Sequence, residues 1–246
     1  MNKLSHVGRF FYSLAFTVLG LLCLLHDDFI IGRPPAWPDT WLLNPALAYV
    51  SGGMIIILSI AILAKKKGYE AALTIAGLML LLSLSRHIPN VMNSWLNALK
   101  SVALFGGTLV IAASFNPKYL KIFLWTGRIS LGAFFIACGY AHLKFYDFVT
   151  GFIPAYIPFH GFFTYFTSIC LIAGGVGILI PFTRKWAALL SGLMVTGWFI
   201  LLHIPRFLMN PADVSDRLGV AESLAFAGIF FVLASLTDSK SKQFAG

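Results

Sequence analysis

Charge is scarce in this sequence, and acidic residues are the scarcest of all. Charged residues make up 11% of the 246 residues, with 9 Asp and Glu against 18 Lys and Arg. A soluble domain of this size carries about 25% charged residues, so the chain has too little polar surface to face water. Its mean hydropathy of +0.84 predicts an integral membrane protein whose main partner is the lipid bilayer.

Cysteines and catalytic motifs are also few. Cys23, Cys138 and Cys170 lie in apolar segments without CxxC spacing, which favours buried thiols over a disulfide framework. No HxxxH or HExxH occurs, so no metal site is predicted. No Ser-His-Asp, paired-carboxylate or phosphate-loop pattern occurs either, so an enzyme acting alone is the least favoured function. Basic cytoplasmic loops account for the formal charge of +9, and no nucleic-acid partner is predicted.

Long apolar stretches dominate what remains. Each is close to the roughly 20 residues that a membrane span requires, and turn or charge signals separate them. No signal-peptide cleavage site follows residues 10–25, so this segment is kept as the first span. The fold class is therefore an all-α polytopic membrane protein with eight unbroken transmembrane helices. The stretches are 9–26, 42–64, 71–88, 95–115, 122–143, 160–182, 186–204 and 217–236.

The two halves of the chain resemble each other. The frame D-F-x-x-G-x-x-P-A occurs at 28–36 and again at 147–155, and His-Ile-Pro occurs at 87–89 and at 203–205. We therefore predict a duplication, with one four-helix repeat in 1–120 and a second in 121–246. Because each repeat has an even number of helices, the two enter the membrane from the same side and are parallel.

The basic residues predict the orientation. Twelve of the 18 Lys and Arg fall on one predicted side, in segments 3–9, 65–67, 118–128, 184–185 and 240–242. The excess marks the cytoplasmic side. We expect a multi-pass protein of the inner, cytoplasmic membrane with both termini in the cytoplasm.

The repeated frame follows the first and fifth helices at the outer face. Gly32 and Gly151 can adopt a positive φ for a sharp reversal, and the prolines stiffen the chain that returns. The favoured interpretation is a rigid outer turn in each half. The alternative is a lid over a cavity between helices, with Asp28 and Asp147 as polar contacts.

Other polar residues gather near the same predicted face. His87, His142 and His203 lie at outer helix ends, where they are structural residues or contacts for a ligand. Lys100 and Glu222 occupy equivalent positions in the fourth and eighth helices, with opposite charge. A lone charge at that depth costs about 3 kcal/mol on insertion scales, so the two either interact inside the bundle or extend to the headgroups. Arg206 is a second candidate partner for Glu222.

The four-helix unit resembles a known family. Its acid-and-proline outer turn after the first helix, Tyr and Gly on the second, basic inner loop and "GLM" on the third are similar to DoxX-like membrane proteins. The resemblance covers each half, so the chain looks like a tandem pair of DoxX-like units. The resemblance implies a setting in membrane redox complexes, including subunits of thiosulfate:quinone oxidoreductase, or in export and assembly. It implies no catalytic residue set.

Two functions from different classes follow. The first is a quinone-linked redox or redox-accessory subunit, in which His203, Arg206, Glu222 and His142 form an outward-facing polar pocket for a quinone head. The second is a non-catalytic binder: an assembly chaperone, or a carrier of a lipid or small molecule. Either function brings a membrane redox or assembly protein as partner.

Overall fold

The computed structural model describes residues 3–37, 43–116, 118 and 120–243, and within these ranges all regular structure is helical. The first half contains α1 (Lys3–Leu25), α2 (Asn44–Leu63), α3 (Gly68–Met79), the π-helical segment η1 (Leu80–Leu84), α4 (Ser85–His87), the 3₁₀ turn η2 (Ile88–Asn90) and α5 (Trp95–Ala113). The second half contains α6 (Leu120–Lys144), α7 (Tyr146–Phe152), α8 (His160–Gly177), α9 (Arg184–Trp198), the π-helical segment η4 (Phe199–His203), α10 (Ile204–Met209) and α11 (Val214–Gln243).

The chain is a multi-pass membrane protein. Within the described ranges, seven continuous helical stretches are long and apolar enough to cross a bilayer. The sixth predicted span, 160–182, corresponds to α8, which has 18 residues and is not among the seven. Its crossing of the membrane stays a prediction. The seven are Lys3–Leu25, Asn44–Leu63, Gly68–Asn90, Trp95–Ala113, Leu120–Lys144, Arg184–Met209 and Val214–Thr237.

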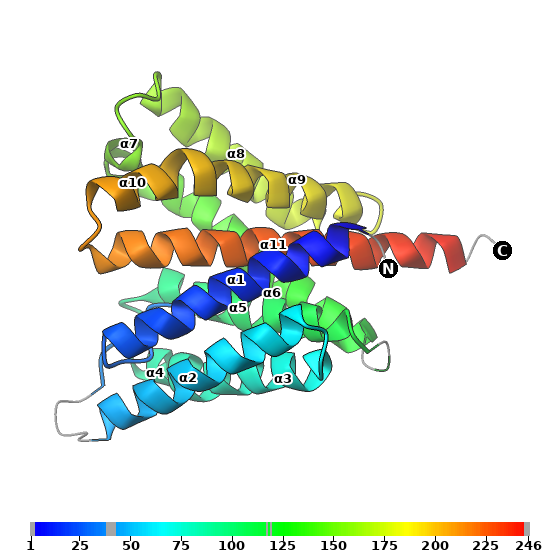
Figure 1. Cartoon of the computed structure of the whole chain (residues 1–246). Coiled ribbons are helices and arrows are strands. Elements are labelled where there is room, and N and C mark those ends of the chain that lie inside the picture. Colours follow the sequence, from blue (N-terminus) through cyan, green and yellow to red (C-terminus); the bar gives the residue numbers. More distant parts are fainter. Residues whose placement is uncertain (1–2, 38–42, 117, 119, 244–246) are drawn as a thin grey trace.

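Helix α11 is the central element of the bundle. It packs against α1, α5 and α9, and most of its length is buried by other helices. In Figure 1 it lies between α8–α10 on one side and α2–α4 on the other. Helix α1 also packs on α2, and α6 packs on both α5 and α8. The first residues of α1 and the last of α11 lie at the same end of the bundle (Figure 1).

Small residues let these helices approach closely. A Cβ atom added to Gly20 in α1 would lie 2.8 Å from the carbonyl oxygen of Gly52 in α2. A Cβ atom on Gly8 would lie 2.6 Å from Gly228 O, and one on Gly127 would lie 3.0 Å from Gly106 O. Lipid tails remove the hydrophobic drive for helix association, so such close backbone packing supplies much of the attraction in a membrane.

The third and seventh predicted helices are unbroken, as expected, but they are not regularly α-helical throughout. Each contains a π-helical segment, η1 or η4, shortly before or within its His-Ile-Pro element. Proline has no N–H to donate and crowds the carbonyl four residues earlier, which favours a local widening. For Pro205 that carbonyl belongs to Leu201, and it accepts a hydrogen bond from the Tyr156 hydroxyl instead.

Candidate functional site

The outer turn after α1 is held by Arg86. Its Nη1 and Nη2 donate to the two oxygens of Asp28 at 3.0 and 2.9 Å, and its Nε donates to Pro35 O at 2.7 Å. A further donation to Phe29 O at 3.0 Å and stacking over Trp37, 4.7 Å from the ring centroid, complete its contacts. A planar guanidinium suits this bidentate geometry. This copy of the frame is therefore a rigid turn, as the sequence predicts.

The backbone of that turn brings apolar side chains inward. Gly32 has a φ of +80°, which only glycine adopts readily, and Arg33 follows at +55°. Phe29 is 1% exposed and Ile31 is fully buried. Apolar side chains of the first outer turn are thus packed inside the helical bundle.

The second copy of the frame folds differently, so a matching rigid turn there was a wrong prediction. Residues 146–152 form α7, and Gly151 lies inside this helix rather than at a positive φ. Phe148, the counterpart of Phe29, is 71% exposed, and Asp147 forms no ion pair within the described residues. The residue before His203 is Leu202 where Arg86 precedes His87. Without a guanidinium to hold Asp147, the segment satisfies its backbone groups as a helix.

Exchanging Arg86 for lysine tests the first turn. Lysine keeps the charge but loses the bidentate pair and the fixed donors to two carbonyls. We expect Arg86→Lys to lower the free energy of unfolding by about 2–3 kcal/mol, read as a lower midpoint in denaturant or thermal unfolding of the detergent-solubilised protein. The matched control is Arg217→Lys, which loses a single donation to Pro211 O and should change stability by under about 0.5 kcal/mol. Equal effects would show that the turn is not held by Arg86.

Lys100 and Glu222 meet inside the bundle, which is the first of the two alternatives that the sequence left open. Lys100 Nζ donates to Glu222 Oε2 at 2.9 Å, and both side chains are largely buried. Arg33 Nε lies 3.4 Å from the same oxygen, and the Gly32 N–H donates to Oε1 at 3.3 Å. The carboxylate on α11 therefore joins α5 to the outer turn, where two cations share one anion.

A hydroxyl network lies beside this cluster. The Ser101 hydroxyl donates to Gly32 O at 3.0 Å and lies 3.0 Å from both Ser83 Oγ and His87 Nε2. Because its only proton points to Gly32 O, Ser101 accepts from Ser83 and from His87, which places the His87 proton on Nε2. His87 is thus engaged with the protein's own turn.

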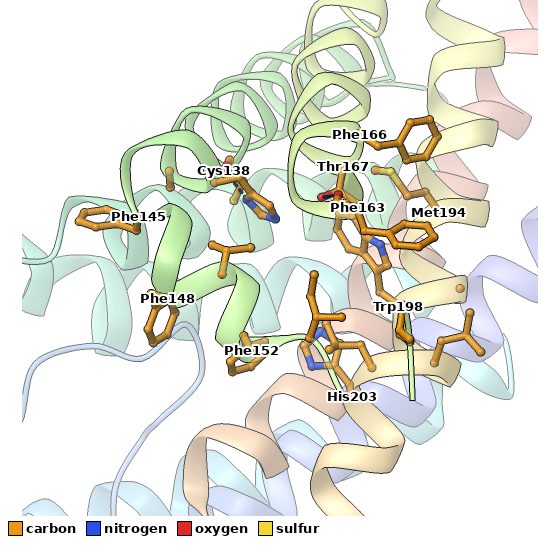
Figure 2. A pocket seen from close by; sticks show the side chains of 18 of the residues that line it. Cys138, Phe145, Phe148, Phe152, Phe163, Phe166, Thr167, Met194, Trp198 and His203 are labelled. Carbon is orange, nitrogen blue, oxygen red and sulfur yellow. Dashed lines mark hydrogen bonds between the residues drawn. The ribbon is translucent and has the colours of Figure 1, made fainter. Parts of the chain in front are cut away.

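A cavity of about 580 Å³ lies in the second half, between α6, α7, α8 and the α9–η4 stretch. Figure 2 shows aromatic side chains such as Phe163 and Trp198 around it, with Cys138, Thr167 and His203 among the few polar ones. The lining residues are Leu96, Cys138, Ala141, His142, Phe145, Phe148, Val149, Phe152, Ile153, Ile157, Phe163, Phe166, Thr167, Met194, Gly197, Trp198, Leu201, Leu202 and His203.

The two histidines of the cavity differ in their surroundings. His142 Nδ1 donates to Cys138 O at 2.8 Å, so in the neutral ring Nε2 carries no proton. His203 packs against α11, where a Cβ on Gly219 would lie 2.7 Å from its Nδ1. Within the described part of the chain, neither nitrogen of His203 has a hydrogen-bond partner. The imidazole of His203 is therefore available to donate a hydrogen bond to a ligand in the cavity.

Arg206 fixes the end of α7 at the cavity mouth. Its Nε donates to Asp216 Oδ1 at 2.9 Å, and its Nη1 donates to Phe152 O at 3.3 Å. The guanidinium carbon also lies 3.5 Å from the centroid of the Phe152 ring. Arg206 thus pairs with Asp216 rather than with Glu222, correcting the partner expected from the sequence.

The predicted site residues therefore form two groups, and two residues belong to neither. His142 and His203 line the cavity, while His87, Lys100, Glu222 and Asp28 form the polar layer around the first outer turn. Arg206 positions α7, and the exposed Asp147 touches neither group. Most of the residues that line the cavity were not predicted from the sequence. The sequence feature that could have indicated the wall is the high frequency of aromatic residues between 145 and 166. Such a frequency is also ordinary in membrane helices.

Comparison with known protein families finds a match for one segment of the chain. The family described as "Domain of unknown function (DUF8561)" matches residues 131–205. This segment contains every residue that lines the cavity except Leu96. No curated protein and no solved structure matches the chain.

Proposed function

We propose that this protein binds a lipid-soluble molecule of the quinone class and serves as a quinone-linked redox or redox-accessory subunit. The observation that carries the proposal is the 580 Å³ cavity, whose wall is mostly aliphatic and aromatic with two imidazoles. Ligand sites have volumes of about 300–1,000 Å³ and few polar groups in an apolar wall. A substituted ring with a hydrocarbon tail suits such a wall, and a ring oxygen suits the imidazole of His203 as a donor.

The cavity also coincides with the segment that recurs in other proteins. Its wall falls almost wholly within the matched residues 131–205, which supports a role for this region beyond packing. In this proposal the resemblance to DoxX-like proteins suggests the redox setting, and a partner subunit carries the electron-transfer groups.

We further propose that the fold consists of eight spans in two parallel repeats, 1–120 and 121–246. Helix α8 has 18 residues, about 27 Å at 1.5 Å per residue, which is close to the hydrocarbon thickness. The packing of α1 on α11 has its counterpart in α6 on α5. The crossing of Gly8 with Gly228 has its counterpart in Gly127 with Gly106, as a twofold axis along the membrane normal requires.

The proposed setting is the inner membrane with both termini in the cytoplasm. The positive-inside rule and the common end of α1 and α11 support it. The cavity, near α7 and the His-Ile-Pro element, then opens toward the extracytoplasmic half of the membrane.

Filling the cavity tests the proposed function. A Cβ at Gly197 meets no atom within 4 Å, so Gly197→Leu places a side chain at the cavity wall without forcing the backbone apart. We expect the variant to fold and to retain at least tenfold less quinone than the wild-type protein. The measurement is mass spectrometry of the organic extract from protein purified in mild detergent.

The matched control is Gly77→Leu on α3, whose added Cβ also meets no atom within 4 Å and does not line the cavity. It should retain quinone like the wild type. Absence of quinone from the wild-type extract, or equal retention by Gly197→Leu, would contradict the proposal. A phospholipid lost from Gly197→Leu in place of quinone would establish the alternative function, a lipid carrier.

A further inference from the structure

We infer that the cavity's ligand presents a carbonyl oxygen to His203, at the place that the chain's own Gly32 carbonyl takes beside His87 in the first half. This inference rests on the proposed function and on the proposed repeat. It names the chemical group that the cavity recognises.

In the first half, the chain's own outer turn occupies the place that corresponds to the ligand. Ser101 donates to Gly32 O, and His87 Nε2 supports Ser101 from 3.0 Å. Phe29 and Ile31 of the same turn are buried. An apolar group and a carbonyl oxygen thus enter together, and the polar layer accepts the oxygen.

The second half has the equivalent residues without the occupant. Ser223 stands where Ser101 stands, directly after the charged residue of its helix, and its hydroxyl donates to Val220 O of its own helix at 3.0 Å. Gly151, the counterpart of Gly32, lies in α7. His203 lines the cavity without a hydrogen-bond partner among the described residues.

The exposure of Phe148 accounts for the cavity volume. In the first half the aromatic residue of the frame is buried, whereas in the second Phe148 is 71% exposed and lines the cavity instead of filling it. His203 is partly buried and lines the cavity, so a bound ligand would remove its N–H from water. That loss of hydration costs free energy unless an acceptor replaces the water, so His203 favours a ligand that brings an acceptor. A ring carbonyl with apolar substituents supplies both the missing oxygen and the missing apolar volume.

Two probes separate the carbonyl from the rest of the ligand. The first is decylubiquinone, and the second is the same compound reduced and fully O-methylated, which keeps the ring and the tail but has no carbonyl. Binding is measured by isothermal titration calorimetry on the full-length protein in detergent. We expect the wild type to bind decylubiquinone about tenfold more tightly, the scale of one buried hydrogen bond.

Variants at the two cavity histidines assign the preference. His203→Phe should bind both probes with equal affinity, and His203→Gln, which keeps an N–H donor, should keep a preference for the carbonyl. His142→Phe is the matched control, because its one neutral N–H is already occupied by Cys138 O. It should keep the wild-type preference.

Each result decides between the two proposals. If wild type binds both probes equally, or if His203→Phe keeps the preference, the carbonyl inference is wrong and the cavity function stands. If wild type binds neither probe, the proposed function falls and the inference with it. Thermal unfolding of each variant shows whether it is folded, and His203→Gln remains the test if His203→Phe is not.

Discussion

Replacing Glu222 with leucine is expected to lower the free energy of unfolding by about 3–5 kcal/mol, the cost of breaking a buried ion pair from one side. Glu222 is 5% exposed and is the only anion contacting Lys100 and Arg33 within the described residues. Without it, the Lys100 ammonium is left in the bundle with no counter-charge. The Gly32 N–H also loses its acceptor. Unfolding of the detergent-solubilised protein, followed by circular dichroism, measures the loss.

The double variant Lys100→Met/Glu222→Leu is the control for this prediction. It replaces both charges with apolar groups, and such replacements are often neutral. Arg33 is the more exposed cation of the cluster and can turn toward water. We therefore expect the double variant to recover most of the stability that Glu222→Leu loses. A double variant as unstable as the single one would mean that packing, rather than charge, fixes this site.

Gly228→Ala is expected to have a comparably large effect, about 3 kcal/mol of lost stability from overpacking. The added Cβ would lie 2.5 Å from Gly8 O and 2.7 Å from Tyr12 N. Both are backbone atoms of α1, so no side chain can rotate away and α1 must separate from α11. The unfolding midpoint of the variant measures the effect.

Gly77→Ala is the matched control for Gly228→Ala. The added methyl meets no atom within 4 Å, and alanine stabilises a helix by up to about 1 kcal/mol over glycine. The two Gly→Ala changes should therefore shift the midpoint in opposite directions. A neutral Gly228→Ala would show that α1 and α11 do not need their close contact.

Much of the helical arrangement could be predicted from local sequence. The apolar stretch at 95–115 corresponds to α5 at Trp95–Ala113, and the stretch at 122–143 falls within α6, because the length of an apolar run reflects the bilayer thickness. The Lys100–Glu222 contact was one of two alternatives, because a charge at that depth needs either a partner or a route to the headgroups. The irregular segments η1 and η4 were not predicted, although Pro89 and Pro205 marked their neighbourhood.

The sequence alone determined that this chain spans a membrane and which segments form its long apolar helices, because hydropathy and turn signals are local properties. Only the tertiary structure decided that one D-F-x-x-G frame is a locked turn and the other is a helix beside a cavity. The difference arises 58 residues after Asp28, where Arg86 reaches back to it, while Leu202 has no charge to offer Asp147. The contact that holds the first conformation is distant in sequence, so two segments that share one frame have different structures.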